Sequence, residues 1–175
     1  MAAPSGLARP TGSMQTIGAA ILLVGSTATV GTALLFEHVG GYIPCALCLQ
    51  ERWPYYISIV LAAIALIAAA GRAKAAIVRG LLGLIAVAML VGLALAVYHS
   101  GVEWHFWAGP SGCAAGNADL SGDLLATIDT IRPPACDEAA GRFLGLSFAG
   151  WNVLASLLFA GIALRAAFGR SDRLA

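Results

Sequence analysis

Four long apolar segments constrain this chain more than any other feature of its sequence. The first covers residues 15–36, which are 22 positions without a charged side chain. At 1.5 Å per residue, a helix of that length crosses a hydrocarbon core of roughly 30 Å. Three more apolar segments follow at residues 53–70, 80–98 and 143–164. We therefore predict an all-α membrane protein: a four-transmembrane-helix bundle that forms a single integral membrane domain over residues 1–175.

The composition supports a membrane protein and argues against several other classes. Hydrophobic residues make up 59% of the chain and charged residues 11%, whereas about a quarter of a soluble domain is charged. A cleaved signal peptide has an apolar core of only about 7–15 residues, so we interpret residues 15–36 as a retained span. The net charge of +1 and the lack of a lysine and arginine cluster give no indication of nucleic-acid binding.

The distribution of basic residues predicts the orientation of the bundle. Seven of the ten lysines and arginines fall on one side of the four spans: Arg9, Arg72, Lys74, Arg79, Arg165, Arg170 and Arg173. Basic residues favour the cytoplasmic side, so both termini are predicted to be cytoplasmic. The loops at residues 37–52 and 99–142 then lie outside, with all four cysteines, in a compartment where disulfides persist.

The first outer loop contains a short cysteine motif directly before the second span. Cys45 and Cys48 are three positions apart, Pro44 precedes them, and Arg52 follows one helical turn after Cys48. On a helix these two cysteines and the arginine share one face. Proline is suited to the first position of a helix, and the helix N-terminus favours a thiolate on Cys45. The motif predicts a dithiol or disulfide at the mouth of a membrane helix, beside a permanent cation.

The second outer loop contains the other two cysteines, Cys113 and Cys136. Between them lies an apolar stripe at roughly helical spacing, formed by Leu120, Leu124, Leu125, Ile128 and Ile131. This stripe predicts either a short helix on the membrane surface or an ordinary amphipathic loop helix.

Four cysteines allow three pairings, and Cys45–Cys48 with Cys113–Cys136 closes the shortest loops. Two such pairs on one surface favour a thiol–disulfide relay, in which a thiolate attacks an accessible disulfide. A purely structural role is the alternative, although a disulfide between Cys45 and Cys48 closes too small a loop to stabilise much. A four-thiolate zinc site is a third reading, and the wide spacing of the second pair disfavours it. No metal ligand is therefore predicted.

These features resemble the bacterial disulfide bond formation protein B family, whose members are quinone reductases that reoxidise the periplasmic oxidase DsbA. The resemblance covers nearly the whole chain. It rests on the segment from Pro44 to Arg52, on 98–104, and on 134–138 followed by 143–147. In the vitamin K epoxide reductase family, which shares the four-helix arrangement, the loop pair precedes the Cys-x-x-Cys motif, whereas here it follows. The resemblance implies a multi-pass protein of the bacterial inner membrane with its active cysteines on the periplasmic side.

The resemblance also implies roles for the cysteines. Cys113 would form the mixed disulfide with the DsbA-like partner, and Cys136 would pass the electrons to Cys45. Cys48 would face a membrane quinone, either ubiquinone or menaquinone. The partner, the quinone type and the oligomeric state do not follow from the sequence.

Three other residues are predicted to bind the quinone. Arg52 keeps its charge at any working pH and would stabilise both a Cys48 thiolate and a quinone oxyanion, since a charge near the bilayer is costly unless it is used. His99 and Glu103 stand one turn apart at the outer end of the third span and, by family position, would line the quinone pocket. The alternatives are an Arg52 that merely extends to the membrane interface or pairs with Glu37 or Glu51, and a His99 that only forms hydrogen bonds. His38 and His105 are left without a role.

Together these observations predict a membrane thiol:quinone oxidoreductase, an enzyme that generates disulfides. The alternative is a non-enzymatic membrane scaffold or partner-binding protein whose disulfides only brace its outer loops.

Overall fold

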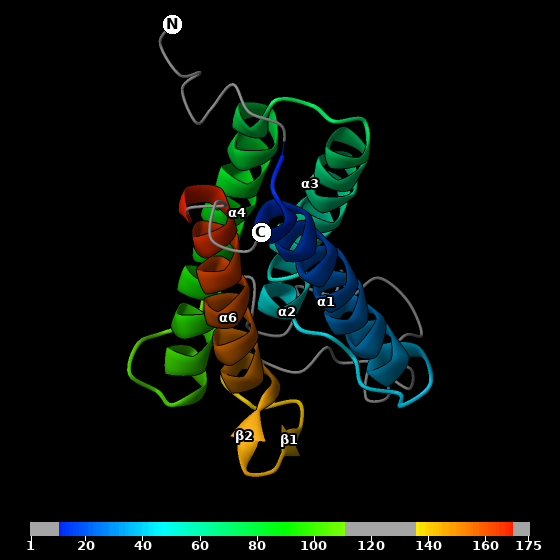
Figure 1. Ribbon diagram of the computed structural model, residues 1–175. Coiled ribbons are helices and arrows are strands. Elements are labelled where there is room, and N and C mark those ends of the chain that lie inside the picture. Colours follow the sequence, from blue (N-terminus) through cyan, green and yellow to red (C-terminus); the bar gives the residue numbers. More distant parts are fainter. Residues whose placement is uncertain (1–10, 111–135, 170–175) are drawn as a thin grey trace, which may run out of the picture.

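The computed structural model describes residues 11–110 and 136–169 of the chain. Within these residues, four helical segments are long and apolar enough to cross a membrane, which confirms the prediction of an all-helical multi-pass membrane protein. The spanning helices are α1 (Ser13–His38), α3 (Trp53–Ala70), α4 (Ala75–Glu103) and α6 (Phe148–Phe168) (Figure 1). The short helix α2 (Ala46–Gln50) leads directly into α3, so that Ala46–Ala70 forms one span.

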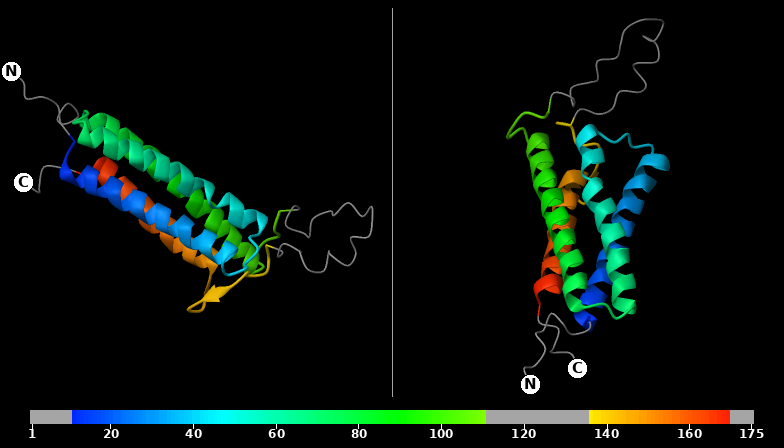
Figure 2. Two further views of the ribbon diagram at one scale, coloured as in Figure 1. Left: turned by 90° about the vertical axis from the view of Figure 1, so that its right-hand side faces the viewer. Right: turned by 90° about the horizontal axis from the view of Figure 1, so that it is seen from above.

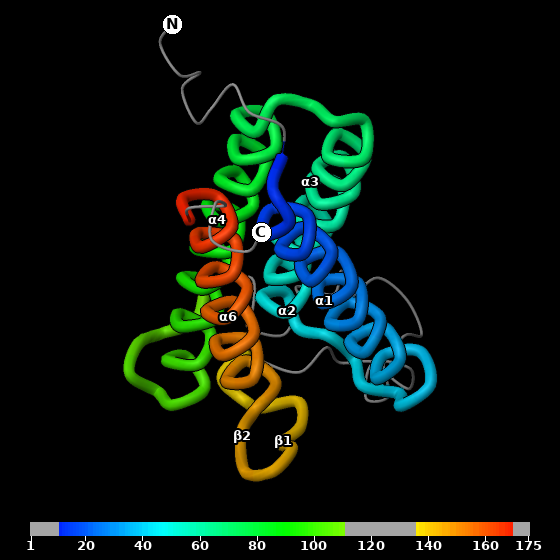
Figure 3. The backbone as a smooth tube through the Cα atoms, in the orientation of Figure 1, coloured from blue at the N-terminus to red at the C-terminus, as the bar shows by residue number. Residues whose placement is uncertain are grey.

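The helices form one elongated bundle in which α4 packs against α3 and α6, and α1 packs against the same two helices. The first turn of α1 and the last turn of α6 lie at one end of this bundle (Figure 2). Helix α2 and the strands β1 (Arg142–Phe143) and β2 (Leu146–Ser147) lie at the opposite end. The path of the backbone returns from the end of α1 to α2 before it enters α3 (Figure 3). The cysteine motif therefore lies where the ends of several helices meet.

Alanines make up half of the buried hydrophobic core, which also contains the larger Leu22, Leu82, Ile85 and Met89. Ala62, Ala65 and Ala163 are fully buried, whereas the larger Ile67 and Leu84 are 73% and 57% exposed. Lipid is as apolar as these large side chains, so the hydrophobic effect does not draw them inward, and close packing of small residues holds membrane helices together. Gly18 shows how close the approach is, because a Cβ atom added there would lie 2.6 Å from the Cβ of Ala166.

The ends of the spans differ from the sequence-based prediction. Helix α1 extends the predicted span of residues 15–36 by two residues at each end. Helix α4 begins at Ala75 and ends at Glu103, whereas the prediction placed that span at 80–98. Arg79 is a charged residue within this longer helix, and a hydrogen bond accounts for its position. The Arg79 guanidinium donates to the backbone oxygen of Gly169 at 2.6 Å, which satisfies a carbonyl at the end of α6.

The last span begins later than predicted because a hairpin precedes it. Strands β1 (Arg142–Phe143) and β2 (Leu146–Ser147) pair antiparallel. Their two-residue turn places Leu144 at φ 52° and Gly145 at φ 84°, the left-handed conformation that tight hairpins require. Ser147 then caps α6, with its hydroxyl accepting the backbone N–H of Gly150 at 3.1 Å. The helix thus starts at Phe148 and not at residue 143.

Cys113 and the predicted surface helix between Cys113 and Cys136 lie outside the described residues.

Candidate functional site

The cysteine motif forms the start of α2, with one change from the prediction. Pro44 does not open the helix, since α2 begins at Ala46 and Cys45 is its N-cap residue. The Cys45 sulfur accepts the backbone N–H of Cys48 at 3.1 Å, which satisfies a donor that a helix start leaves unpaired. Because the sulfur itself caps the helix, the chain needs no proline at the first helical position.

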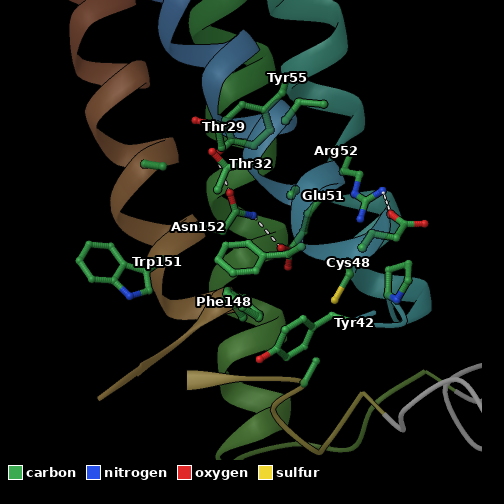
Figure 4. Close-up of a pocket in the computed structure, with 18 of the residues that line it drawn as sticks. Thr29, Thr32, Tyr42, Cys48, Glu51, Arg52, Tyr55, Phe148, Trp151 and Asn152 are labelled. Atoms are coloured by element: carbon green, nitrogen blue, oxygen red, sulfur yellow. Dashed lines mark hydrogen bonds and ion pairs between the residues drawn. The ribbon is translucent and has the colours of Figure 1, made fainter. Parts of the chain in front are cut away.

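The two thiols of this motif lie side by side and face different surroundings. Their Sγ atoms are 2.6 Å apart, and both cysteines are free. Cys45 is only 3% exposed and packs in a small buried cluster, whereas Cys48 lines a cavity between the helices. Figure 4 shows the Cys48 sulfur directed into that cavity. The pair therefore connects the buried cluster on one side with the cavity on the other.

A chain of buried hydrogen bonds starts at the Cys45 sulfur. His99 of α4 lies with Nε2 3.6 Å from that sulfur and with Nδ1 2.8 Å from Oε1 of Glu51. The side-chain amide of Asn152, on α6, donates to the other oxygen of Glu51 at 2.7 Å. The hydroxyl of Tyr55 donates in turn to the amide oxygen of Asn152. Both Glu51 and His99 are more than nine-tenths buried, and this network satisfies the polar atoms that burial would otherwise leave unpaired.

The surroundings of Cys45 favour its thiolate. The pKa of Cys45 is lowered to about 4, chiefly by the hydrogen bond from the Cys48 thiol and next by His99 and the backbone N–H of Cys48. Burial opposes this shift, because it disfavours the charged form. Cys45 is thus prepared to act as a nucleophile or as a leaving group in thiol exchange.

Cys136 joins the same buried cluster from the far part of the chain. It is 1% exposed and packs with Cys45, Leu47 and Val102, with the partly buried Cys48 and Tyr98 against them. Cys136 is disulfide-bonded. The fold therefore brings three of the four predicted cysteines together, and the fourth, Cys113, lies outside the described residues.

The cavity beside Cys48 has a volume of about 440 Å³. Its walls come from α1, the motif, α3 and α6, and the aromatic side chains among the lining residues are Phe36, Tyr42, Tyr55, Phe148 and Trp151. Polar groups reach it at a few points, mainly Glu37, Glu51, Arg52 and Asn152. Figure 4 shows the last three of these. A mostly apolar space with a few convergent polar groups is typical of a small-molecule site.

Arg52 lies at this cavity and is paired. Its guanidinium donates to Oε2 of Glu37 at 2.6 Å, and the two side chains are 13% and 24% exposed. This contact is one of the alternatives that the sequence left open. Because Arg52 also lines the cavity with Cys48, the pairing is compatible with a role there.

The other two residues predicted to line a quinone pocket lie behind the dithiol. Neither His99 nor Glu103 is among the residues that line the cavity. The Glu103 side chain is 4% exposed, and its Oε1 lies 4.0 Å from Nε2 of His99. The prediction ended this span at residue 98, but the helix continues to Glu103. His99 is therefore part of the helix and is buried beside Glu51, and does not lie in a loop. Their predicted contact with a quinone stays a prediction.

Sequence reasoning missed two members of this site and undervalued a third. Asn152 and Tyr55 had no assigned chemistry, and Glu51 was considered only as a partner for Arg52. The available signal was the position of Asn152 inside a predicted apolar span, since a polar residue at that depth is costly and needs a partner.

The site also groups three atoms that could hold a metal ion. The sulfurs of Cys45 and Cys48 and a ring nitrogen of His99 all lie within 4.8 Å of one another. This set differs from the four-thiolate zinc site considered from the sequence, because among the described residues it includes a histidine and does not include Cys136.

A four-helix membrane bundle with two adjacent thiols at the end of a span defines a membrane protein built for thiol–disulfide chemistry. The family model described as disulfide bond formation protein DsbB matches residues 15–166. The chain therefore belongs to the DsbB family, as its motifs predicted, and membership of this family implies disulfide oxidoreductase activity.

Two relatives agree with this assignment over most of the chain. The "Disulfide bond formation protein B" of Chromohalobacter salexigens is 31% identical over 132 residues, which are 71% of this chain and 74% of the relative. "Uncharacterized protein RP370" of Rickettsia prowazekii is 29% identical over 155 residues, which are 82% of this chain and 84% of that protein. No solved structure matches the chain.

Proposed function

We propose that this protein is a membrane thiol:quinone oxidoreductase that reoxidises a periplasmic dithiol protein of the DsbA kind. The observation that carries the proposal is the position of the Cys45–Cys48 pair. On one side Cys45 shares a buried cluster with Cys136, and on the other side Cys48 lines the cavity. Electrons that arrive at Cys136 thus have a neighbouring sulfur to move to, and those that reach Cys48 have a space for an acceptor.

The exchange steps use the four cysteines in order. A thiolate of the partner attacks Cys113 of a Cys113–Cys136 disulfide, so that the mixed disulfide forms and Cys136 leaves as a thiolate. That thiolate attacks the Cys45 sulfur of a Cys45–Cys48 disulfide, so that a Cys45–Cys136 bond forms and Cys48 leaves as the thiolate. The second thiol of the partner then displaces Cys113, and the Cys113 thiolate attacks Cys136, which re-forms the Cys113–Cys136 disulfide and releases Cys45 as a thiolate. Packing of Cys136 and Cys45 in one buried cluster supports the step between these two cysteines, because exchange requires the sulfurs to meet.

The chemical character of the cavity lining suits a quinone head group. Aromatic side chains such as Phe148 and Trp151 provide flat apolar walls, while Arg52 supplies a hydrogen-bond donor and a positive charge near Cys48. When bound, a quinone would accept two electrons and two protons from a dithiol. Arg52 would hold a negative charge on the Cys48 sulfur or on an acceptor oxygen, since its guanidinium stays charged. The cavity lining is compatible with both ubiquinone and menaquinone.

The location of the protein is part of the same proposal. The basic residues favour cytoplasmic termini in a bacterial inner membrane, with α2 and the β1–β2 hairpin on the periplasmic side. The dithiol end of the bundle would then meet the partner in the compartment where disulfides persist.

Absorbance of a soluble ubiquinone analogue tests the proposed activity. Purified protein is mixed with the analogue and a reduced DsbA-type protein, and loss of the oxidised-quinone band is followed. We expect loss only when the protein and the reduced partner are both present, and we expect Cys48→Ser to abolish it. The assay is repeated with menaquinone analogues, and the purified protein is checked for correct folding. No loss under these conditions would favour the scaffold with structural disulfides.

A trapping experiment tests the sulfur order separately. In a variant with Cys48→Ser and Cys113→Ser, only Cys45 and Cys136 remain. Mild oxidation should then join these two cysteines within one chain, as peptide mapping would reveal. Absence of this bond in folded protein would contradict the proposed step between them.

A further inference from the structure

The hydrogen-bonded chain behind the dithiol connects the Cys45 sulfur with the cavity, and the cysteine relay leaves it without a function. His99 faces the sulfur with Nε2 and faces Glu51 with Nδ1. Glu51 also lines the cavity. One end of this chain therefore lies at a thiol, and the other end lies where the proposed acceptor would bind.

We infer that Glu51 is the residue that carries to the cavity the proton that His99 takes from Cys45. The inference rests on the proposed function, because it concerns the last step of that reaction. In that step Cys45 and Cys48 would form a disulfide, and a bound quinone would take up the two electrons. The reduced pair also gives up two protons, and these must reach the two quinone oxygens.

The two protons leave from different places. Cys48 lines the cavity and can release its proton there directly. Cys45 is 3% exposed and lies on the other side of the motif, so the proton that it loses on forming the thiolate needs a carrier to the cavity. Nε2 of His99 accepts that proton, Nδ1 of His99 donates to Oε1 of Glu51, and the Glu51 carboxyl delivers a proton to the cavity. The dithiol is thus oxidised to the disulfide, and a bound quinone would be the oxidant that takes up its two electrons and two protons.

Geometry favours Glu51 over the other carboxylate near this histidine. Oε1 of Glu51 lies 2.8 Å from Nδ1 of His99, whereas Oε1 of Glu103 lies 4.0 Å from Nε2. A hydrogen bond is formed only at the first of these distances. Glu103 also does not line the cavity, so a proton on it would not reach the acceptor directly.

Asn152 and Tyr55 hold the carboxylate of Glu51 in place. The Asn152 amide donates to Oε2 of Glu51 at 2.7 Å, which leaves Oε1 for His99. The Asn152 oxygen accepts from Tyr55, and the Tyr55 hydroxyl lies 3.0 Å from Oγ of Ser156. Three helices thus fix one carboxylate. Asn152 and Tyr55 are positioning residues in this scheme, because each acts through Glu51.

The first test measures the thiol alone and needs no quinone. In a background of Cys48→Ala, Cys113→Ser and Cys136→Ser, Cys45 is the one remaining cysteine, and its thiolate is titrated by ultraviolet absorbance. The groups that face the site are His99, Glu103, Glu51, Tyr55 and the Arg52–Glu37 pair. Adding Glu51→Gln should move the titration of Cys45 to higher pH by about one unit, because His99 loses the carboxylate partner through which it accepts the proton of Cys45.

Glu51→Asp should restore part of that shift, because it keeps the charge. Ser58→Ala serves as the matched control, since Ser58 is a buried polar residue of α3 for which the described part of the chain supplies no hydrogen-bond partner. It should leave the titration unchanged. If Glu51→Gln left the titration of the Cys45 thiol unchanged, the inference would be overturned.

The second test separates this inference from the proposed function. Fully reduced wild-type protein is mixed with a soluble ubiquinone analogue, and one turnover is followed in H₂O and in D₂O. We expect Glu51→Gln to slow this turnover about a hundredfold, the effect of losing a general acid–base group. Asn152→Leu should slow it less and should alter its pH profile.

The outcomes of the second test are distinct. If the wild-type protein does not reduce the quinone, the proposed function fails. If the wild type reacts and Glu51→Gln reacts equally fast with the same isotope effect, the proposed function stands and the proton route through Glu51 is wrong. Slowing by Glu103→Gln alone would also overturn the route, since the proton would then leave through Glu103.

Discussion

The guanidinium of Arg52 donates a hydrogen bond to Glu37 at 2.6 Å, and this contact joins the start of α3 to the end of α1. Both residues line the cavity that contains the Cys48 sulfur. Glu37 therefore neutralises part of the positive charge that Arg52 could offer to that sulfur. The Arg52–Glu37 pair therefore determines how strongly the positive charge of Arg52 acts on groups in the cavity.

Glu37→Gln should make the Cys48 thiol of the reduced protein more reactive. The substitution keeps the size of the side chain and removes its charge, so Arg52 interacts more strongly with a Cys48 thiolate. We expect alkylation of Cys48 to become about threefold faster or more, since a charge-assisted contact contributes on the order of 1 kcal/mol. Mass spectrometry of the modified peptide measures the rate. Arg52→Met should slow the same alkylation, and unchanged rates in both variants would contradict the prediction.

Cys45 should show a reactivity that depends little on pH around neutrality. Its pKa of about 4 lies below an ordinary thiol pKa of about 8.5, so the thiolate is already formed at neutral pH. Alkylation of Cys45 should stay nearly constant between about pH 6 and 8, whereas an ordinary thiol speeds up about tenfold per unit.

Cys48→Ala provides the control for this behaviour. The hydrogen bond from Cys48 is the largest cause of the lowered pKa, so its loss should raise the pKa of Cys45 and restore a rate that increases with pH. A flat profile that persists in Cys48→Ala would assign the effect to His99 or to the helix N-terminus.

Asn152→Leu should destabilise the folded bundle. The substitution removes the donor to Oε2 of Glu51 and leaves that buried oxygen unpaired. An unsatisfied buried polar group costs about 1–3 kcal/mol, and more when it is charged. Thermal unfolding in detergent, followed by circular dichroism, measures the loss.

A double-substitution cycle with Glu51→Gln checks the origin of that loss. If the loss comes from the contact between Glu51 and Asn152, the combined variant should lose less stability than the two single effects added together. Strict additivity would mean that Asn152 stabilises the bundle by other contacts.

Gly101→Ala should displace Trp107 from the end of α4. A Cβ atom at position 101 would lie 2.0 Å from Cζ2 of Trp107, which backbone and ring cannot both accommodate. Trp107 is otherwise held by a hydrogen bond from its indole N–H to the Tyr98 oxygen at 2.8 Å and by stacking on the Tyr98 ring. We expect a changed tryptophan fluorescence spectrum with little loss of helix content. An identical spectrum would mean that the ring does not lie over Gly101.

The sequence by itself determined the spans and the place of the dithiol. Apolar length specifies a membrane helix, since backbone polar groups in lipid must be satisfied within the helix. Spacing alone put Cys45 and Cys48 on one turn, because residues three apart are neighbours on a helix. Span ends were less well determined, as the five-residue extension of α4 to Glu103 shows, because polar side chains inside a bundle can be satisfied by other helices.

Tertiary structure alone decided which polar groups meet behind the dithiol. Glu51 contacts His99 across 48 positions of the chain and Asn152 across 101, and neither spacing follows a helical period. Such contacts depend on how the helices are placed relative to one another, which small residues in the core decide through close packing. Hydropathy records only that a residue is polar, so the sequence could predict a cysteine pair at a helix start but not the carboxylate, imidazole and amide that surround it.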